Sequence, residues 1–177
     1  MPSAPAPAET PAVTDLVRLV RSAQAGNEDA FAELYRRFAR MVHGVVLARI
    51  ARTEVDDVVQ DVFMAAFERL AELREPAAFG GWLAAIARHR AADLGRRLVP
   101  VHAVVEESAP ARAHEQAEAR AILAAIRSLP EAYSETLVLR LVEGMTGAEI
   151  AERTGLTPGS VRVNLHRGMK LLREKLT

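Results

Sequence analysis

The sequence contains no cysteine, so it can form neither a disulfide framework nor a thiolate metal site. It also lacks any apolar run that approaches about 18 residues, the length of a membrane helix. Its first residues do not show the basic-then-apolar order of a signal peptide. These absences predict a cytoplasmic protein that keeps to a reducing compartment and does not enter a membrane.

The chain has no net charge, because 23 basic residues balance 23 acidic ones. A nucleic-acid binder usually draws its affinity from an excess of cations, but here the two signs are separated along the chain. Residues 76–99 and 145–177 are basic, whereas residues 55–75 and 106–118 are acidic. The separation predicts two kinds of surface and two kinds of partner.

Helical periodicity runs through most of the chain, and the alternation typical of a strand is absent from the sequence. The first thirteen residues, rich in Pro and Ala, are predicted to be a disordered tail. Helices are expected at residues 14–26, 28–46, 55–70 and 82–97, with a Pro- and Gly-containing loop at 74–81. The third helix has the clearest apolar stripe, formed by Val55, Val58, Val59, Val62, Phe63, Ala66, Phe67 and Leu70. Residues 14–98 are therefore expected to form one helical domain.

A second domain is expected after a flexible linker at residues 99–118, which holds two prolines and no consistent period. Helical spacing resumes at Ala119 and halts at Leu129-Pro130, where the proline suits the first turn of a helix that runs to Gly144. Residues 119–177 would form this domain. The fold class predicted is all-α, with two small helical domains.

The C-terminal segment predicts a helix-turn-helix. Thr146 and Glu149 have the spacing of a capping box, and Gly155 is placed to end that helix in a left-handed turn. Thr157 and Pro158 then suit the N-cap and first position of a second helix. That helix has an apolar side, made of Val161, Leu165, Met169, Leu172 and Leu176, and a basic side.

The basic side of the last helix suits docking in the major groove of DNA. Arg162, Asn164, His166 and Arg167 fall in its early turns, where side chains reach base edges, and Lys170 and Arg173 lie later, near phosphates. The alternative is a solvated basic face, since the helix dipole also favours cations near a C-terminus.

An acidic and amide cluster lies on the outer face of the third helix, formed by Asp56, Asp57, Gln60 and Asp61 with Met64 beside it. Paired carboxylates can act as a general acid and base, but no nucleophile, phosphate loop or set of metal ligands accompanies them. Neither catalysis, nor a metal, nor a cofactor is expected. A solvated face and a protein contact with a basic helix remain equally compatible with this cluster.

Aromatic and arginine side chains occur together at the start and along the length of the fourth helix: Phe79, Trp82, Arg88, Arg90, Arg96 and Arg97. Trp82 is suited to core packing. A functional alternative is binding of single-stranded DNA, with bases stacked on rings and phosphates paired with guanidinium groups. His89 and Asp93 are too few for a metal site and are expected to form a surface hydrogen bond or ion pair.

Taken in order, these segments resemble the extracytoplasmic-function (ECF) group of the sigma-70 family of RNA polymerase sigma factors. Asp56-Asp57-Val-Val-Gln60-Asp61-Val-Phe63 resembles its core-polymerase-binding motif, and the segment from Phe79 to Asp93 resembles its promoter-melting and minus-10 segment. Leu129-Pro130-Glu131, Glu149-Ile150-Ala151-Glu152 and Ser160-Val161-Arg162 resemble its minus-35-binding domain.

The resemblance implies a role for each segment. Residues 14–98 would be region 2, which binds the clamp helices of the polymerase's largest subunit and melts the minus-10 element. Residues 119–177 would be region 4, which contacts the polymerase flap and reads the minus-35 element, and an anti-sigma factor is a possible further partner. The residues implied in minus-35 binding are Thr157, Ser160, Arg162, Val163, Asn164, His166, Arg167 and Lys170.

Two other functions remain open from the sequence. A sigma-mimicking adaptor would bind an anti-sigma factor without touching DNA, and a stand-alone helix-turn-helix regulator would bind DNA without the polymerase. His89, Asn164, His166 and Gly168 depart from the residues usual in the family at those positions, so the promoter sequence is not predicted.

Overall fold

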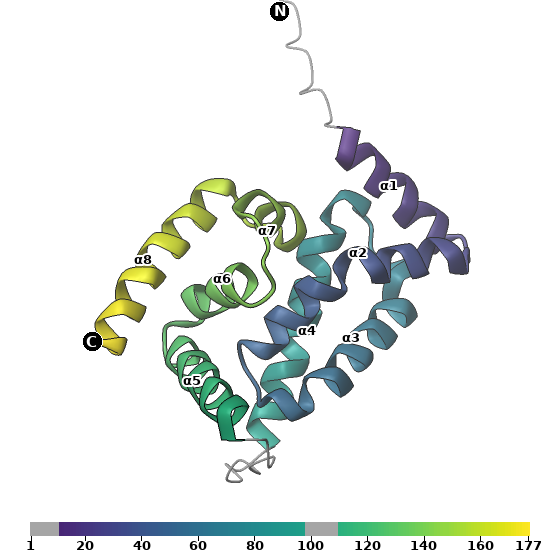
Figure 1. Ribbon diagram of the computed structural model, residues 1–177. Coiled ribbons are helices and arrows are strands. Elements are labelled where there is room, and N and C mark those ends of the chain that lie inside the picture. The colour runs from purple at the N-terminus through teal and green to yellow at the C-terminus, as the bar shows by residue number, and fades with distance from the viewer. Residues whose placement is uncertain (1–10, 98–109) are drawn as a thin grey trace, which may run out of the picture.

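Helices account for nearly all of the regular structure in the computed structural model, which describes residues 11–97 and 110–177 (Figure 1). Within these residues the chain forms α-helices and short 3-10 helices and no strand, which confirms the predicted all-α class. The α-helices are α1 (Pro11–Gln24), α2 (Glu28–Leu47), α3 (Val55–Arg69), α4 (Phe79–Arg97), α5 (Pro110–Arg127), α6 (Glu131–Leu141), α7 (Gly147–Thr154) and α8 (Pro158–Leu176).

The N-terminal domain consists of α1 to α4, and its buried apolar residues belong to one core that continues into the C-terminal helices. Asn27 caps α2 as predicted, its side chain accepting a hydrogen bond from the amide of Ala30 at 3.0 Å. The stripe on α3 is buried between α2 and α4, with one correction: Phe67 is 54 % exposed. Its ring lies at the edge of the core, where it packs on Phe31 of α2 at a centroid distance of 4.9 Å.

The predicted ends of the tail and of the linker differ from the structure. The expected tail reached residue 13, but α1 begins at Pro11, because proline is well accommodated at the first position of a helix. The expected linker reached residue 118, but α5 begins at Pro110. Residues 116–121 of α5 are exposed, so this helix starts without the apolar stripe that makes a helix visible in sequence. The remainder of the tail and linker lies outside the described residues.

The loop predicted at 74–81 is largely helical. A 3-10 turn (Pro76–Ala78) leads directly into α4, which begins at Phe79 rather than Trp82. Gly80 and Gly81 therefore lie in the first turn of α4. Gly lowers helix propensity, so the local sequence does not explain why two glycines lie in this turn.

The C-terminal domain contains the predicted helix-turn-helix. The capping box between Thr146 and Glu149 is complete, and Gly155 adopts φ 74° after α7. Thr157 caps α8, with Pro158 in its first turn. Leu176, expected on the inner side, is instead 54 % exposed, and the whole end of α8 from residue 173 to 177 is exposed. Gly168 is buried where α8 faces α6. A Cβ at this position would lie only 3.1 Å from the side chain of Leu137, so glycine lets the two helices approach closely.

The two domains pack against each other. Helices α6 and α7 lie on α2 and α4, so segments distant in sequence form a common interface (Figure 1). Helix α3 lies on the far side of the N-terminal domain from this interface, and α8 lies on the outer side of the C-terminal domain (Figure 1). The outer faces of α3 and α8 are therefore the natural places to look for partner surfaces.

Candidate functional site

The outward face of α3 combines acidic and amide side chains. Asp56, Asp57, Gln60 and Asp61 are all exposed, as the helical pattern predicts. Asp56 and Asp57 lie in the first turn of α3, where the positive end of the helix dipole favours carboxylates. Met64, one turn further on, is 55 % exposed. We call these five residues the acidic face.

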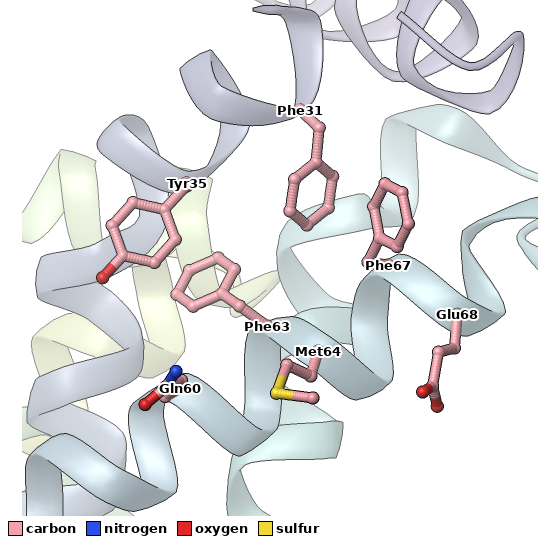
Figure 2. Close-up of a pocket in the computed structure, with 7 residues that line it drawn as sticks. All are labelled: Phe31, Tyr35, Gln60, Phe63, Met64, Phe67 and Glu68. Atoms are coloured by element: carbon pink, nitrogen blue, oxygen red, sulfur yellow. The ribbon is translucent and has the colours of Figure 1, made fainter. Parts of the chain in front are cut away.

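An open apolar groove adjoins the acidic face. Figure 2 shows that its two walls come from α2 and α3, and its volume is about 280 Å³. The residues that line this aromatic groove are Phe31, Tyr35, Gln60, Phe63, Met64, Phe67 and Glu68. Gln60 and Met64 belong to both surfaces, so the groove and the acidic face form one continuous site.

The aromatic rings hold the groove open by packing in pairs across the two helices. Tyr35 packs on Phe63 at a centroid distance of 4.4 Å, and Phe31 packs edge-on against Phe67 at 4.9 Å. Tyr35 and Phe67 are 44 % and 54 % exposed. Rigid aromatic side chains and a methionine that remain this exposed are typical of a protein-binding surface.

Sequence analysis missed Phe31, Tyr35 and Phe67 as members of this site. Apolar periodicity alone placed Phe67 in the stripe that faces the core. A signal was nevertheless present: two aromatic residues four positions apart occur on each helix, which places each pair on one helical face. The contact between α2 and α3 does not cover these faces completely, since Tyr35 and Phe67 remain exposed.

At the start of α4, Phe79 and Trp82 differ in their availability. Phe79 is fully buried, with its ring 5.0 Å from that of Phe38. Trp82 is half-buried and packs on Phe79 at 5.9 Å. Only the ring of Trp82 is partly accessible, and Phe79 supports it from below.

The arginines of α4 are also unequal. Arg90 and Arg96 are exposed, and Arg96 pairs with Asp93 on the same helix. Arg88 instead points into the domain interface and pairs with Glu135 of α6 at 2.8 Å. The side chain of Arg97 lies outside the described residues. The expected surface contact between His89 and Asp93 is confirmed, at 3.1 Å.

On α8 most residues predicted to bind DNA are exposed. The exposed set comprises Thr157, Ser160, Arg162, Val163, His166, Arg167 and Lys170. Thr157 and Ser160 also organise the helix start, since the Thr157 hydroxyl accepts the Ser160 amide at 3.1 Å. Asn164 is half-buried, and its amide donates to the Thr136 hydroxyl at 3.4 Å, so it is partly engaged with α6.

Residues 11–97 and 110–177 contain neither a cluster of metal ligands nor a membrane-spanning helix. None of their His, Asp and Glu side chains gather in groups of three or more that could hold a metal ion. No helix among them is both long and apolar enough to span a membrane.

Comparison with known protein families identifies the class of protein to which this chain belongs. Residues 34–99 match the sigma-70 region 2 family and residues 119–172 match the sigma-70 region 4 family. The two halves of the fold, with the helix-turn-helix in the second, are therefore the two domains of a sigma factor, a transcription initiation factor. We refer to α1–α4 as region 2 and to α5–α8 as region 4.

Similarity to individual proteins shows which group of sigma factors the chain belongs to. The RNA polymerase sigma factor CarQ of Myxococcus xanthus is 34 % identical, over 85 % of this chain and 91 % of its own length. The ECF RNA polymerase sigma-E factor of Haemophilus influenzae is 28 % identical, over 89 % of this chain and 93 % of its own length. The solved structure of CnrH in complex with the cytosolic domain of CnrY matches with a TM-score of 0.62 at 29 % identity, covering 91 % of this chain and 96 % of that one. The chain belongs to the ECF group of sigma-70 family RNA polymerase sigma factors.

Proposed function

We propose that the acidic face and the aromatic groove together form the surface by which this sigma factor binds core RNA polymerase. The observation that carries the proposal is the exposure of Tyr35, Met64 and Phe67 beside the carboxylates of Asp57 and Asp61. An apolar centre with a charged rim suits a helical partner that carries apolar and basic side chains. The clamp helices of the largest polymerase subunit, implied by the resemblance, are the partner we assign to it.

We assign minus-10 DNA to the start and outer side of α4. Trp82 offers a partly accessible ring to an extruded base, with Phe79 supporting it, and Arg90 and Arg96 offer cations to the backbone. Arg88 and Arg97 belong to the same assignment. Opening DNA costs about 1.4 kcal/mol per base step, so binding an extruded base lowers the free energy of the open state.

We assign minus-35 DNA to α8. Arg162 and Arg167 extend from its early turns, where a recognition helix meets base edges in the major groove, and Lys170 follows for phosphate contact. Thr157 and Ser160 start the helix, and Val163, Asn164 and His166 complete the surface. Two further partners follow from the resemblance: the polymerase flap for region 4, and an anti-sigma factor. Because the polymerase is cytoplasmic, we place the protein in the cytoplasm.

The acidic face is tested by charge reversal. The double variant Asp57→Lys with Asp61→Lys should weaken binding to core RNA polymerase about 100-fold, because two attractive contacts become repulsive. The matched control reverses two exposed carboxylates of region 4, Glu118→Lys with Glu152→Lys, and should bind core as the wild type does. Circular dichroism of both variants reports whether the helices are intact. Unaltered affinity of the Asp57/Asp61 variant would remove the assignment.

A further inference from the structure

A carboxylate of region 4 is buried against two arginines of region 2. The side chain of Glu135, on α6, is only 6 % exposed. Arg88 of α4 donates to both of its oxygens, at 2.8 and 2.9 Å, and Arg49, just beyond α2, donates to one at 2.7 Å. Such forked pairing fixes the orientation of the two domains as well as their proximity.

Glu135, Arg88 and Arg49 form a triad in which each charge depends on the others. Burial by itself raises the pKa of Glu135, but the hydrogen bonds and charges of Arg88 and Arg49 outweigh burial and leave the pKa below its usual value. The carboxylate is therefore charged near neutral pH. Removing that charge would leave two arginines facing one another at a largely buried position, and breaking a buried ion pair in this way is strongly destabilising.

Glycines bring the two domains into close contact at two further points. On α2, a Cβ at Gly44 would lie 2.6 Å from a side-chain carbon of Leu139 on α6. In the first turn of α4, a Cβ at Gly80 would collide with the carbonyl oxygen of Arg153 on α7 and lie 3.0 Å from its carbonyl carbon. These positions explain why α4 tolerates a glycine in its first turn: the end of α7 occupies the space where a side chain would be.

Polar contacts at the rim of the interface set its register. His43 of α2 lies 2.6 Å from the carboxylate of Glu143, and Arg40 donates to the backbone carbonyl of the same residue. At the other end, Arg127 of α5 donates to the carbonyl of Leu47, the last residue of α2, at 2.7 Å. The packing of the two regions is therefore specified by complementary groups along the whole interface.

The interface covers part of one proposed functional surface and leaves the others open. It takes up Arg88 and covers the first turn of α4, both of which lie in the segment assigned to minus-10 DNA. The acidic face, the aromatic groove and the basic side of α8 remain exposed. In this arrangement the polymerase-binding surface is available, whereas the minus-10 surface is incomplete: Arg88 and the first turn of α4 are engaged, while Arg90 and Arg96 stay exposed.

The packed arrangement is also too short for a promoter. The minus-10 and minus-35 elements are 25 base pairs apart, about 85 Å at 3.4 Å per pair. A compact chain of 177 residues has a radius of gyration of about 16 Å and is about 40 Å across. Region 2 and region 4 cannot reach both elements while they stay in contact.

We propose that the packed arrangement is an autoinhibited state of the free sigma factor, in which Glu135 acts as a latch that holds region 4 on region 2 and withholds Arg88 and the start of α4 from DNA. This inference rests on the proposed function, since it assumes that α4 and α8 bind the two promoter elements. Opening the latch frees Arg88 and the start of α4, which completes the minus-10 surface, and it separates the regions, while the polymerase-binding surface is the same in both states.

The latch is tested by measuring the distance between the regions in the free protein. The chain has no native cysteine, so nitroxide labels can be attached at Ala51→Cys and Ala132→Cys alone, two exposed positions near the contact of Arg49 with Glu131. Electron–electron double resonance should give one short, narrow distribution of distances between the two labels in the otherwise wild-type chain. Glu135→Gln should shift the distribution to longer and broader distances.

Matched variants separate the latch from general effects of mutation. Glu152→Gln makes the same charge change at an exposed position of α7 and should keep the short distance. Gly80→Ala, which changes no charge, should open the protein, whereas Gly81→Ala should not, because its Cβ would lie at an ordinary 3.5 Å from the carbonyl oxygen of Thr154. Circular dichroism confirms that each variant remains helical.

Functional measurements distinguish failure of the latch from failure of the proposed function. Glu135→Gln should bind a fluorescent promoter fragment about tenfold more tightly than Glu152→Gln, because apparent affinity rises with the fraction of molecules in the competent state, and should bind core polymerase equally well. Short distances retained in both Glu135→Gln and Gly80→Ala, or a wild type that is already open, would overturn the latch. Absence of binding to core and to promoter in every variant would overturn the proposed function instead, whatever the distances show.

Discussion

Replacing Phe67 by alanine should weaken the binding of core RNA polymerase while leaving the free protein folded. The ring is 54 % exposed and projects into the aromatic groove (Figure 2). Burying a whole phenylalanine side chain contributes about 1.5–3 kcal/mol. Since 54 % of the side chain is still accessible, about 0.8–1.6 kcal/mol remains to be gained when a partner covers it. Its loss corresponds to a rise in Kd of about four- to fifteenfold.

The same variant has a modest effect on stability. Phe67 contacts the ring of Phe31 edge-on, and such a pair contributes about 0.5–1.5 kcal/mol beyond area burial. Together with the buried half of the ring, the free energy of unfolding should fall by about 1–3 kcal/mol, which lowers Tm by about 2–12 °C in a protein of this size. The variant is therefore folded at 25 °C, where binding is measured.

The assay is fluorescence anisotropy of the labelled sigma factor titrated with core polymerase. Leu176→Ala is the matched control, because Leu176 is also a large apolar residue that is 54 % exposed but lies at the end of α8, away from the groove. The control should bind core as the wild type does. Equal affinity of Phe67→Ala and wild type, or an equal loss in the Leu176→Ala control, would refute the assignment of the groove.

Further predictions concern region 4 and the domain interface. Arg162→Ala and Arg167→Ala should each weaken promoter binding by about 1–3 kcal/mol without weakening core binding, as measured on the polymerase holoenzyme in a gel-shift titration; a parallel loss of core binding would contradict the division between the regions. The pKa of His43 is raised, above all by its hydrogen bond with Glu143. The negative charges of Glu143 and Asp56 also raise this pKa, whereas burial of the imidazole and the positive charge of Arg52 lower it. A raised pKa stabilises the packed state below the ordinary histidine pKa of about 6.5, and this contribution is lost as pH rises through the raised value. The short label distance should therefore be more populated at about pH 6 than at about pH 8.5, and His43→Gln should flatten that dependence; a wild type with no pH dependence would contradict this role.

Local signals in the sequence were sufficient to predict much of this fold. The capping box of Thr146 and Glu149, the left-handed Gly155 and the Thr157-Pro158 helix start each depend on residues a few positions apart, and the structure has all of them. The period of α3 likewise predicts which side faces the core, and the exposure of its acidic face follows from that period.

Features that depend on distant parts of the chain could not be predicted in this way. Apolar periodicity assigns Phe67 to the core, but whether its ring is covered depends on where α2 ends its contact with α3. Arg88 looks like any basic residue on a helix until Glu135, far along the chain, is placed against it. Gly80 suggests a loop in sequence, and only the approach of α7 explains a glycine inside a helix there.

The two alternative functions make distinct predictions. A sigma-mimicking adaptor would not bind promoter DNA with the polymerase, and a stand-alone helix-turn-helix regulator would bind DNA without it. The exposed acidic face with its groove on α3 and the exposed basic side of α8 are both accounted for when the polymerase and the promoter are bound together.

The most direct test of the central claim is run-off transcription by purified core bacterial RNA polymerase on a library of genomic fragments, with and without this protein. We expect discrete transcripts that appear only when the protein is added and disappear with the Asp57→Lys and Asp61→Lys double variant. Transcripts identical to those of core polymerase alone would contradict the account.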